Sequence, residues 1–255
     1  MDKIEEYILN IPEDLFSEID RKKEILDSKR PLPRETINSL RENSVLEWTY
    51  NSNAIEGNTL TLIETKVVLE GITVGGKSMR EHLEAINHKE AIGYLEELVK
   101  KENLLSELDI KGIHKLVLKG IDDKVAGTYR KGQVVISGAT FVPPAGILVR
   151  DKMEQLILQY TKWNKKYHPL VVAALMHGEF VKIHPFEDGN GRVARLIMNF
   201  VAMRSGYTPI VIKKEVRKEY YLALDKAATT LDYTDFIKLV AKSSNESLEL
   251  YLKVI

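Results

Sequence analysis

The stretch LVVAALMHGEFVKIHPFEDGNGRVARLIMNFV, residues 170–201, decides the fold. Its first part carries the apolar residues of a buried helix, which Pro185 must end because proline disfavours helical geometry at the residue before it. Its last part repeats apolar residues at helical spacing from Val193 to Val201, which is typical of a helix facing a core. The stretch therefore predicts two buried helices joined by a short polar loop.

Most of the remaining chain shows the same three- and four-residue spacing of apolar side chains, so we expect a mainly α fold. We predict helices over residues 35–55, 62–69, 78–101, 106–118, 148–165, 170–182, 191–205, 214–228 and 233–253. One segment differs. Residues 133–142 hold two short β-prone runs around Ser137, Gly138, Ala139 and Thr140, which predicts a β-hairpin. By itself this hairpin is either a packed connector or a clamp that donates backbone hydrogen bonds to a substrate.

Composition excludes several classes of protein. The 255 residues include 37 basic and 37 acidic side chains, so the formal charge is zero and a broad surface for nucleic acid is not expected. The absence of cysteine excludes a disulfide framework, a zinc finger and a thiolate nucleophile. The opening residues do not resemble a signal peptide and the apolar runs are too short to cross a membrane, so we expect a cytoplasmic protein.

The loop after Pro185 has the composition of an anion site. Gly189 and Gly191 let the backbone approach a ligand closely, and a helix that begins near Gly191 offers unpaired N–H groups to a phosphate. Arg192 and Arg195 lie three residues apart, on neighbouring positions of that helix. Two guanidinium groups beside an amide nest indicate a ligand with more than one phosphate.

Two further side chains of this loop can act on such a ligand. Asp188 can hold Mg²⁺, which proteins commonly share between one or two carboxylates and substrate phosphates. His184 can accept a proton near neutral pH. Each residue also has an ordinary interpretation, since histidine caps helices and Asp-Gly-Asn-Gly forms turns. A metal hydrolase using His177, His184 and Asp188 is an alternative, but these spacings match no familiar zinc site and the arginines would repel the cation.

Residues 184–195 resemble the signature of the Fic family, His-Pro-Phe-x-Asp/Glu-Gly-Asn-Gly-Arg-x-x-Arg, at every specified position. The resemblance to Fic proteins extends to four other segments, residues 54–61, 127–144, 217–221 and 241–252. It therefore covers the chain from about Asn43 to its end. It implies a Fic-type helical core over residues 43–255 with a β-hairpin flap. Residues 1–42 are expected to form an N-terminal helical extension whose role the resemblance does not explain.

The resemblance implies transfer of AMP from ATP to a Ser, Thr or Tyr hydroxyl of a target protein. His184 would deprotonate the hydroxyl, and Asp188 would bind Mg²⁺ between the α- and β-phosphates. The resemblance assigns the nucleotide to Gly189, Asn190, Gly191, Arg192, Arg195, Tyr220 and Tyr221. The flap would hold the target segment by strand-like pairing, which favours the clamp over the connector. Ala228 replaces an asparagine of some relatives, which weakens the case for adenine in particular.

A second motif predicts control of the site. Ser52-Asn-Ala-Ile-Glu56-Gly57 fits the inhibitory pattern of the family, Ser/Thr-x-x-x-Glu-Gly/Asn, on a helix over about residues 43–57. An ordinary helix end with a surface charge is the alternative. However, the helix dipole disfavours an acid in the last turn, so a cationic partner explains Glu56 better. In the inhibitory interpretation Glu56 pairs with Arg195 in place of the γ-phosphate. The same glutamate would also take part in the reverse reaction, which removes AMP from the modified target.

Two other functions stay open. A Fic-type enzyme can transfer another phosphate-containing group, including UMP, phosphocholine or a phosphoryl group, and a Fic-like chain can be an inactive nucleotide-binding module. Nucleic-acid binding would depend only on the basic residues between Lys213 and Lys218, which are typical of a solvated helix start. We expect no nucleic-acid or membrane partner. The resemblance implies a homodimer as a further partner, whereas the target and the signal that releases Glu56 cannot be read from the sequence.

Overall fold

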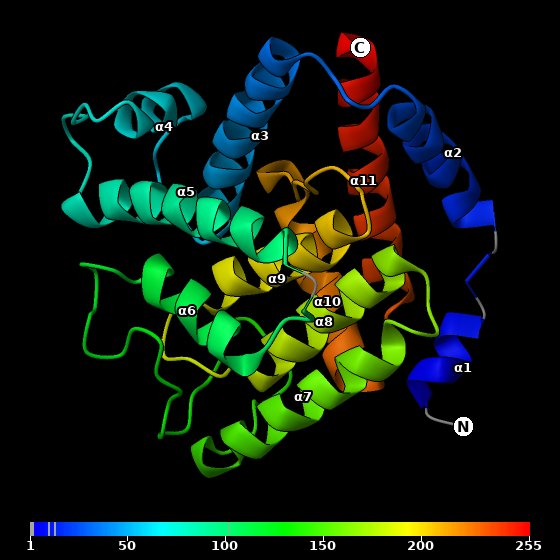
Figure 1. Cartoon of the computed structure of the whole chain (residues 1–255). Helices are drawn as coiled ribbons and strands as arrows, with labels where there is room; N and C mark the ends of the chain where they lie inside the picture. The colour runs from blue at the N-terminus through cyan, green and yellow to red at the C-terminus, as the bar shows by residue number, and fades with distance from the viewer. Residues whose placement is uncertain (1–2, 10, 13, 102) are drawn as a thin grey trace.

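The computed structural model describes residues 3–9, 11–12, 14–101 and 103–255, and places the predicted buried helix pair at its centre (Figure 1). Residues 1, 2, 10 and 13 of the predicted N-terminal extension lie outside the described residues. The α-helices are α1 (Lys3–Leu9), α2 (Asp14–Ser28), α3 (Arg34–Ile55), α4 (Leu62–Leu69), α5 (Met79–Val99), α6 (Glu107–Val117), α7 (Val149–Trp163), α8 (Pro169–Ile183), α9 (Asn190–Arg204), α10 (Arg217–Thr230) and α11 (Thr234–Val254). Two short 3₁₀ turns, η1 (Gly146–Leu148) and η2 (Lys214–Val216), precede α7 and α10. The mainly α prediction is confirmed.

Helix α8 is deeply buried because its sequence is apolar nearly all round. It packs on α9 along its length, and α7, α10 and α11 cover its other sides. Helices α5 and α6 cover α9 from the opposite side. The polar loop between α8 and α9 is therefore fixed at both ends by helices in the core.

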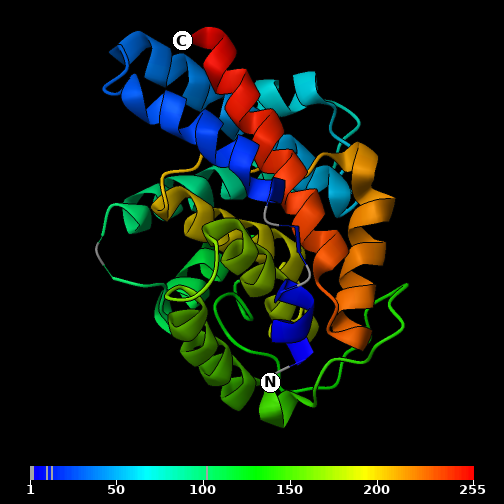
Figure 2. The same cartoon turned by 90° about the vertical axis from the view of Figure 1, so that its right-hand side faces the viewer.

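The N-terminal helices belong to the same hydrophobic core as the rest of the described chain. Helix α2 lies along α11 (Figure 2), and Phe16, Ile19 and Leu26 join the main core cluster. Helix α3 runs unbroken from Arg34 to Ile55, so the expected boundary at residues 42 and 43 falls inside a helix. No helix in the described part of the chain has the length and apolar character needed to span a membrane.

The predicted β-hairpin over residues 133–142 is wrong, since none of these residues lies in a strand. The segment, which we call the flap, turns at Ser137 and Gly138, and the Ala139 N–H donates to the Ile136 carbonyl at 3.1 Å. Side chains replace the expected ladder, because Gln133 Nε2 donates to the Pro143 carbonyl at 2.9 Å. Two strands without a sheet to join are only marginally stable in water. The β-prone residues therefore form an extended loop.

Candidate active site

The loop between α8 and α9 presents His184 in an unusual backbone conformation. His184 ends α8 with φ 50° and ψ 60°, in the left-handed region, and its N–H donates to the Phe180 carbonyl at 2.9 Å. The predicted end of the helix before Pro185 is confirmed. A left-handed conformation is rare for a residue other than glycine, and it turns the chain sharply out of the helix.

His184 is partly buried, and this sets its protonation state. Burial lowers the pKa of His184 to about 4, and the guanidinium of Arg130 also lowers it. The imidazole is therefore neutral at pH 7 and has a nitrogen free to accept a proton. This is the state that a general base requires.

Asn190 and His114 hold the loop in shape. The Asn190 side chain donates to the Phe186 carbonyl and accepts the Phe186 N–H, both at 2.9 Å, so it braces the loop and leaves only its backbone N–H for a ligand. Phe186 is fully buried and stacks on the His114 ring, with 3.6 Å between the centroids. Burial lowers the pKa of His114 to about 4, so this ring is neutral. Its Nδ1 accepts the Gly127 N–H at 2.8 Å, so Nε2 carries the proton and donates to the Asp188 carbonyl at 3.0 Å.

Arg195 is the centre of a buried network that joins α3, α9 and α10. Its side chain is 2% exposed; Nε donates to Ser52 Oγ at 2.9 Å and Nη2 to the Ser52 carbonyl at 2.8 Å. Nη2 also lies 2.7 Å from Glu56 Oε1, and Nη1 donates to the Tyr220 hydroxyl at 3.1 Å. Burial by itself lowers the pKa of Arg195, but Tyr220 and Glu56 outweigh this effect, so the pKa is raised. Both residues singled out in the second motif thus contact Arg195.

The carboxylate of Glu56 lies at the N-terminus of α9, where the sequence predicts an anion. A Cβ atom added to Gly191 would overlap Glu56 Oε1, so only glycine leaves room for the carboxylate at this position. Gly189 precedes the helix with φ 76°, and the first N–H groups of α9 carry the positive end of its dipole. The N-terminus of α9 therefore already holds an anion, supplied by the end of α3.

Arg192 and Asp188 form a second charged group beside this position. Arg192 is 2% exposed, and its Nη1 and Nη2 lie 3.3 Å from Glu84 and 3.4 Å from Asp188. Its Nε and Nη1 make no hydrogen bond within the described part of the chain, although both are buried. Unsatisfied buried donors of a cation are costly, so they favour an anionic ligand here.

Asp188 is a carboxylate of the loop that is partly exposed to solvent and also lies beside the N-terminus of α9. It contacts Arg80, accepts the Gly189 N–H at 2.6 Å and keeps 46% of its side chain exposed. Burial raises the pKa of Asp188, but Arg192, the Gly189 N–H and Arg80 together lower it, so the group is ionised at neutral pH. Among the described residues, no group of three or more candidate ligands could hold a metal ion. A single exposed carboxylate still fits Mg²⁺, which keeps several waters and takes its other ligands from phosphates.

A cavity of about 370 Å³ opens beside this site. Its wall brings together His184, Gly191 and Glu56 with the flap residues Ser137, Gly138 and Ala139. Thr140, the next flap residue, is tied to α10, since its N–H and hydroxyl donate to the Asp225 carboxylate at 2.7 and 2.6 Å. The flap thus covers the cavity although it forms no strand.

The two tyrosines of α10 occupy different positions at this cavity. Tyr220 is buried, and its hydroxyl lies 2.9 Å from His177 Nε2 as well as close to Arg195. Tyr221 is 40% exposed, and its hydroxyl donates to the Ile55 carbonyl at 3.1 Å. Tyr220 therefore positions Arg195, whereas Tyr221 bonds to the end of α3 and lines the cavity.

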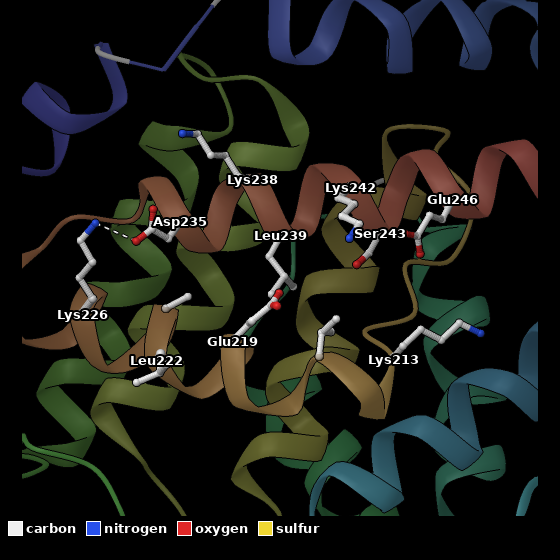
Figure 3. Close-up of a pocket in the computed structure, with 12 residues that line it drawn as sticks. Lys213, Glu219, Leu222, Lys226, Asp235, Lys238, Leu239, Lys242, Ser243 and Glu246 are labelled. Atoms are coloured by element: carbon white, nitrogen blue, oxygen red, sulfur yellow. Dashed lines mark hydrogen bonds and ion pairs between the residues drawn. The ribbon is translucent and has the colours of Figure 1, made fainter.

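A larger groove lies on the outer side of α10, against α11 (Figure 3). Its volume is about 520 Å³, and its wall alternates lysine with acidic residues over a few leucines. Lys226 is paired there with Asp235 and Asp232. None of residues 184–195 reaches this groove, so the chemistry of the loop belongs to the smaller cavity.

Comparison with known proteins agrees with this geometry. The model of the Fic/DOC family matches residues 104–202. A solved Fic-domain signaling protein from Bacteroides thetaiotaomicron is 31% identical, with a TM-score of 0.84 over 94% of this chain and 96% of that one. The chain belongs to the Fic/DOC family. The Fic-1 structure from C. elegans is 33% identical, with a TM-score of 0.83 over 94% of this chain and 71% of that one.

Among curated relatives, the protein adenylyltransferase Fic of Aedes aegypti is 35% identical over 244 residues, which are 93% of this chain and 47% of the relative. The chain spans about half the length of the curated Fic relatives it matches. The family membership and the Fic fold are thus established.

Several residues of the site were not found from the sequence, namely Arg80, Glu84, His114, Arg130 and Asp225. Each contacts residues 184–195 or the flap from a distant part of the sequence, and none lies in a motif that predicts chemistry. A weak signal existed for Arg130, which is a lone arginine directly before the β-prone run.

Proposed function

We propose that this Fic chain transfers AMP from ATP to a hydroxyl of a target protein. The observation that carries the proposal is a neutral histidine, His184, beside an anion-binding helix N-terminus with two buried arginines. In the reaction, the hydroxyl oxygen forms a bond to the α-phosphorus while the bond from that phosphorus to the β-phosphate oxygen breaks. His184 accepts the hydroxyl proton, and pyrophosphate leaves.

The remaining residues serve to place ATP for this attack. Arg192, with its unsatisfied donors, and Arg195 would meet the β- and γ-phosphates, and the backbone N–H groups of Gly189, Asn190 and Gly191 would line the anion hole. Asp188 would hold Mg²⁺, which when bound neutralises charge on the phosphates. Tyr221 would contact the nucleobase of ATP. Positioning and charge stabilisation account for most of the rate in phosphoryl chemistry.

We infer that Glu56 inhibits this reaction. Its carboxylate lies over Gly191 and 2.7 Å from Arg195, where the γ-phosphate would have to bind, so ATP must displace it to bind productively. We also propose removal of AMP from the modified target. The displaced Glu56 would orient a water whose oxygen bonds to the phosphorus of the AMP group, while the bond from that phosphorus to the target oxygen breaks and the target hydroxyl regains its proton.

Mass spectrometry of intact protein tests the transfer. The Glu56→Gly variant with ATP and Mg²⁺ should add the mass of AMP to itself or to proteins of a host lysate, and His184→Ala in that background should add nothing. Parallel reactions with UTP and with CDP-choline distinguish other Fic-type transfers by the mass added. ATP binding without any added mass would instead identify an inactive nucleotide-binding module.

We also propose a homodimer. Ile63 on α4, Ile72 after it and Met79 at the start of α5 are exposed apolar side chains near one another in sequence. Their burial against a second copy would explain this exposure. Light scattering of the parent protein should give twice the mass of the chain, and Met79→Glu should halve it.

A further inference from the structure

Arg130 is a buried cation without an anionic partner. Its exposed fraction is 2%, and no carboxylate within the described ranges lies close enough to form an ion pair with it. It donates instead to carbonyl oxygens, with Nε to His184 at 2.7 Å, Nη1 to Gly132 at 2.6 Å, and Nη2 to Pro144 at 2.6 Å and to Ile183 at 3.3 Å. Its own N–H donates to the Pro185 carbonyl at 2.9 Å.

These carbonyls belong to two parts of the site. Ile183, His184 and Pro185 form the turn that presents His184, whereas Gly132 and Pro144 flank the flap on either side. One planar guanidinium therefore joins both ends of the flap to the backbone of the histidine. Lysine could not replace it, because an ammonium group places all its donors at a single point.

Stability alone does not explain this arrangement. A buried charge without a counter-ion costs free energy that neutral hydrogen bonds only partly offset, and an apolar residue would avoid that cost. The bonds hold His184 in a left-handed conformation that is unfavourable for a residue other than glycine. Strain retained at a functional residue is a feature of active sites.

We propose that Arg130 is a positioning residue, which orients His184 for proton transfer and fastens the flap to the same turn. The flap and the base then keep a fixed distance from each other when a target segment lies along the flap. This inference depends on the proposed function, because it takes His184 as the base.

The test uses Arg130→Lys and Arg130→Gln in the Glu56→Gly background. Because Arg192, Arg195 and the N-terminus of α9 are unchanged, KM for ATP should stay within about threefold. Displacement of a catalytic group by about 1 Å costs about 100-fold, so kcat should fall by about that factor in both variants. Arg150→Lys, on the exposed start of α7, is the matched control and should keep the parent kcat.

Titration of His184 by NMR separates positioning from packing and does not require activity. Arg130→Gln removes the positive charge near the imidazole, so the pH at which His184 takes up a proton should rise, while Arg130→Lys should change it less. If Glu56→Gly transfers no AMP, the proposed function fails, and this titration still tests whether the Arg130 charge lies close to the His184 ring.

A kcat equal to that of the parent in Arg130→Lys would overturn the proposal. A fall in kcat that only matches a smaller fraction of protein able to bind ATP would also overturn it. If neither variant folds, exchange of the Arg130 Nε–H is measured in the Glu56→Gly protein. Slow exchange is expected for a buried bond to the His184 carbonyl, and exchange as fast as that of the exposed Arg150 would refute it.

Discussion

The contact between Glu56 and Arg195 makes the strongest prediction about activity. Replacing Glu56 with glycine removes the carboxylate from the N-terminus of α9 and leaves Arg195 bound to Ser52 and Tyr220. The vacated position then has a helix N-terminus and a buried guanidinium for the γ-phosphate. ATP no longer has to displace a bound anion before it can bind productively.

The size of the effect follows from the bond that ATP would otherwise have to break. A hydrogen bond to a charged group contributes about 1.5–3 kcal/mol, and the Glu56 side chain is 33% exposed, so solvent screening favours the lower part of that range. Because each 1.4 kcal/mol corresponds to about tenfold, Glu56→Gly should raise kcat/KM for ATP by about 10- to 30-fold.

Initial rates of AMP incorporation, measured against ATP concentration, test this value. Glu56→Gln keeps the shape without the charge and should lie between the parent and Glu56→Gly. Glu42→Gly is the matched control, since it removes an exposed carboxylate from the same helix and should leave kcat/KM unchanged. An unchanged kcat/KM in Glu56→Gly, with ATP and Mg²⁺ present, would refute the inhibitory role.

Three further predictions concern the loop and its supports. In the Glu56→Gly background, the rate should be nearly constant around neutral pH and fall only at about pH 4 or below, because the variant loses one of the charges that raise the His184 pKa. A fall centred near the usual histidine pKa of 6.5 would contradict the buried base. Asp188→Asn should raise the Mg²⁺ concentration needed for half-maximal rate by about tenfold or more, while ATP binding without metal, followed by calorimetry, should not weaken. His114 and His184 have folded-state pKa values of about 4, below the unfolded value of 6.5, so the unfolded chain binds more protons between these limits. The free energy of unfolding, from urea titrations, should therefore decrease by a few kcal/mol as the pH falls from about 6.5 to about 4, and less in His114→Phe.

Much of the fold could be predicted from local sequence. The helix spacing of apolar residues located the helices of the core, and Pro185 correctly marked the end of α8. These features depend on backbone geometry and periodicity, which neighbouring residues determine.

The flap shows where local propensity fails. Its β-branched and aromatic residues favour strands, yet a strand needs a partner, and no sheet exists among the described residues to supply one. Side-chain contacts fix the flap instead: Asp225, distant in sequence, holds Thr140, and Arg130 binds the carbonyls of Gly132 and Pro144 on either side of the flap. Whether a β-prone segment forms a strand is a property of the surrounding structure.

The sequence by itself determined the helical class of this protein, the chemistry of the loop from His184 to Arg195 and the residues able to bind an anion there. The pairing of Glu56 with Arg195 was expected only through the family resemblance, because the two residues are 139 apart in sequence, and the tertiary structure brings them into contact. Only the tertiary structure decided that Arg130 and His114 hold the loop, through bonds to backbone carbonyls. Every residue has such a carbonyl, so the sequence carries no sign of which one a distant side chain will reach, and packing alone selects it.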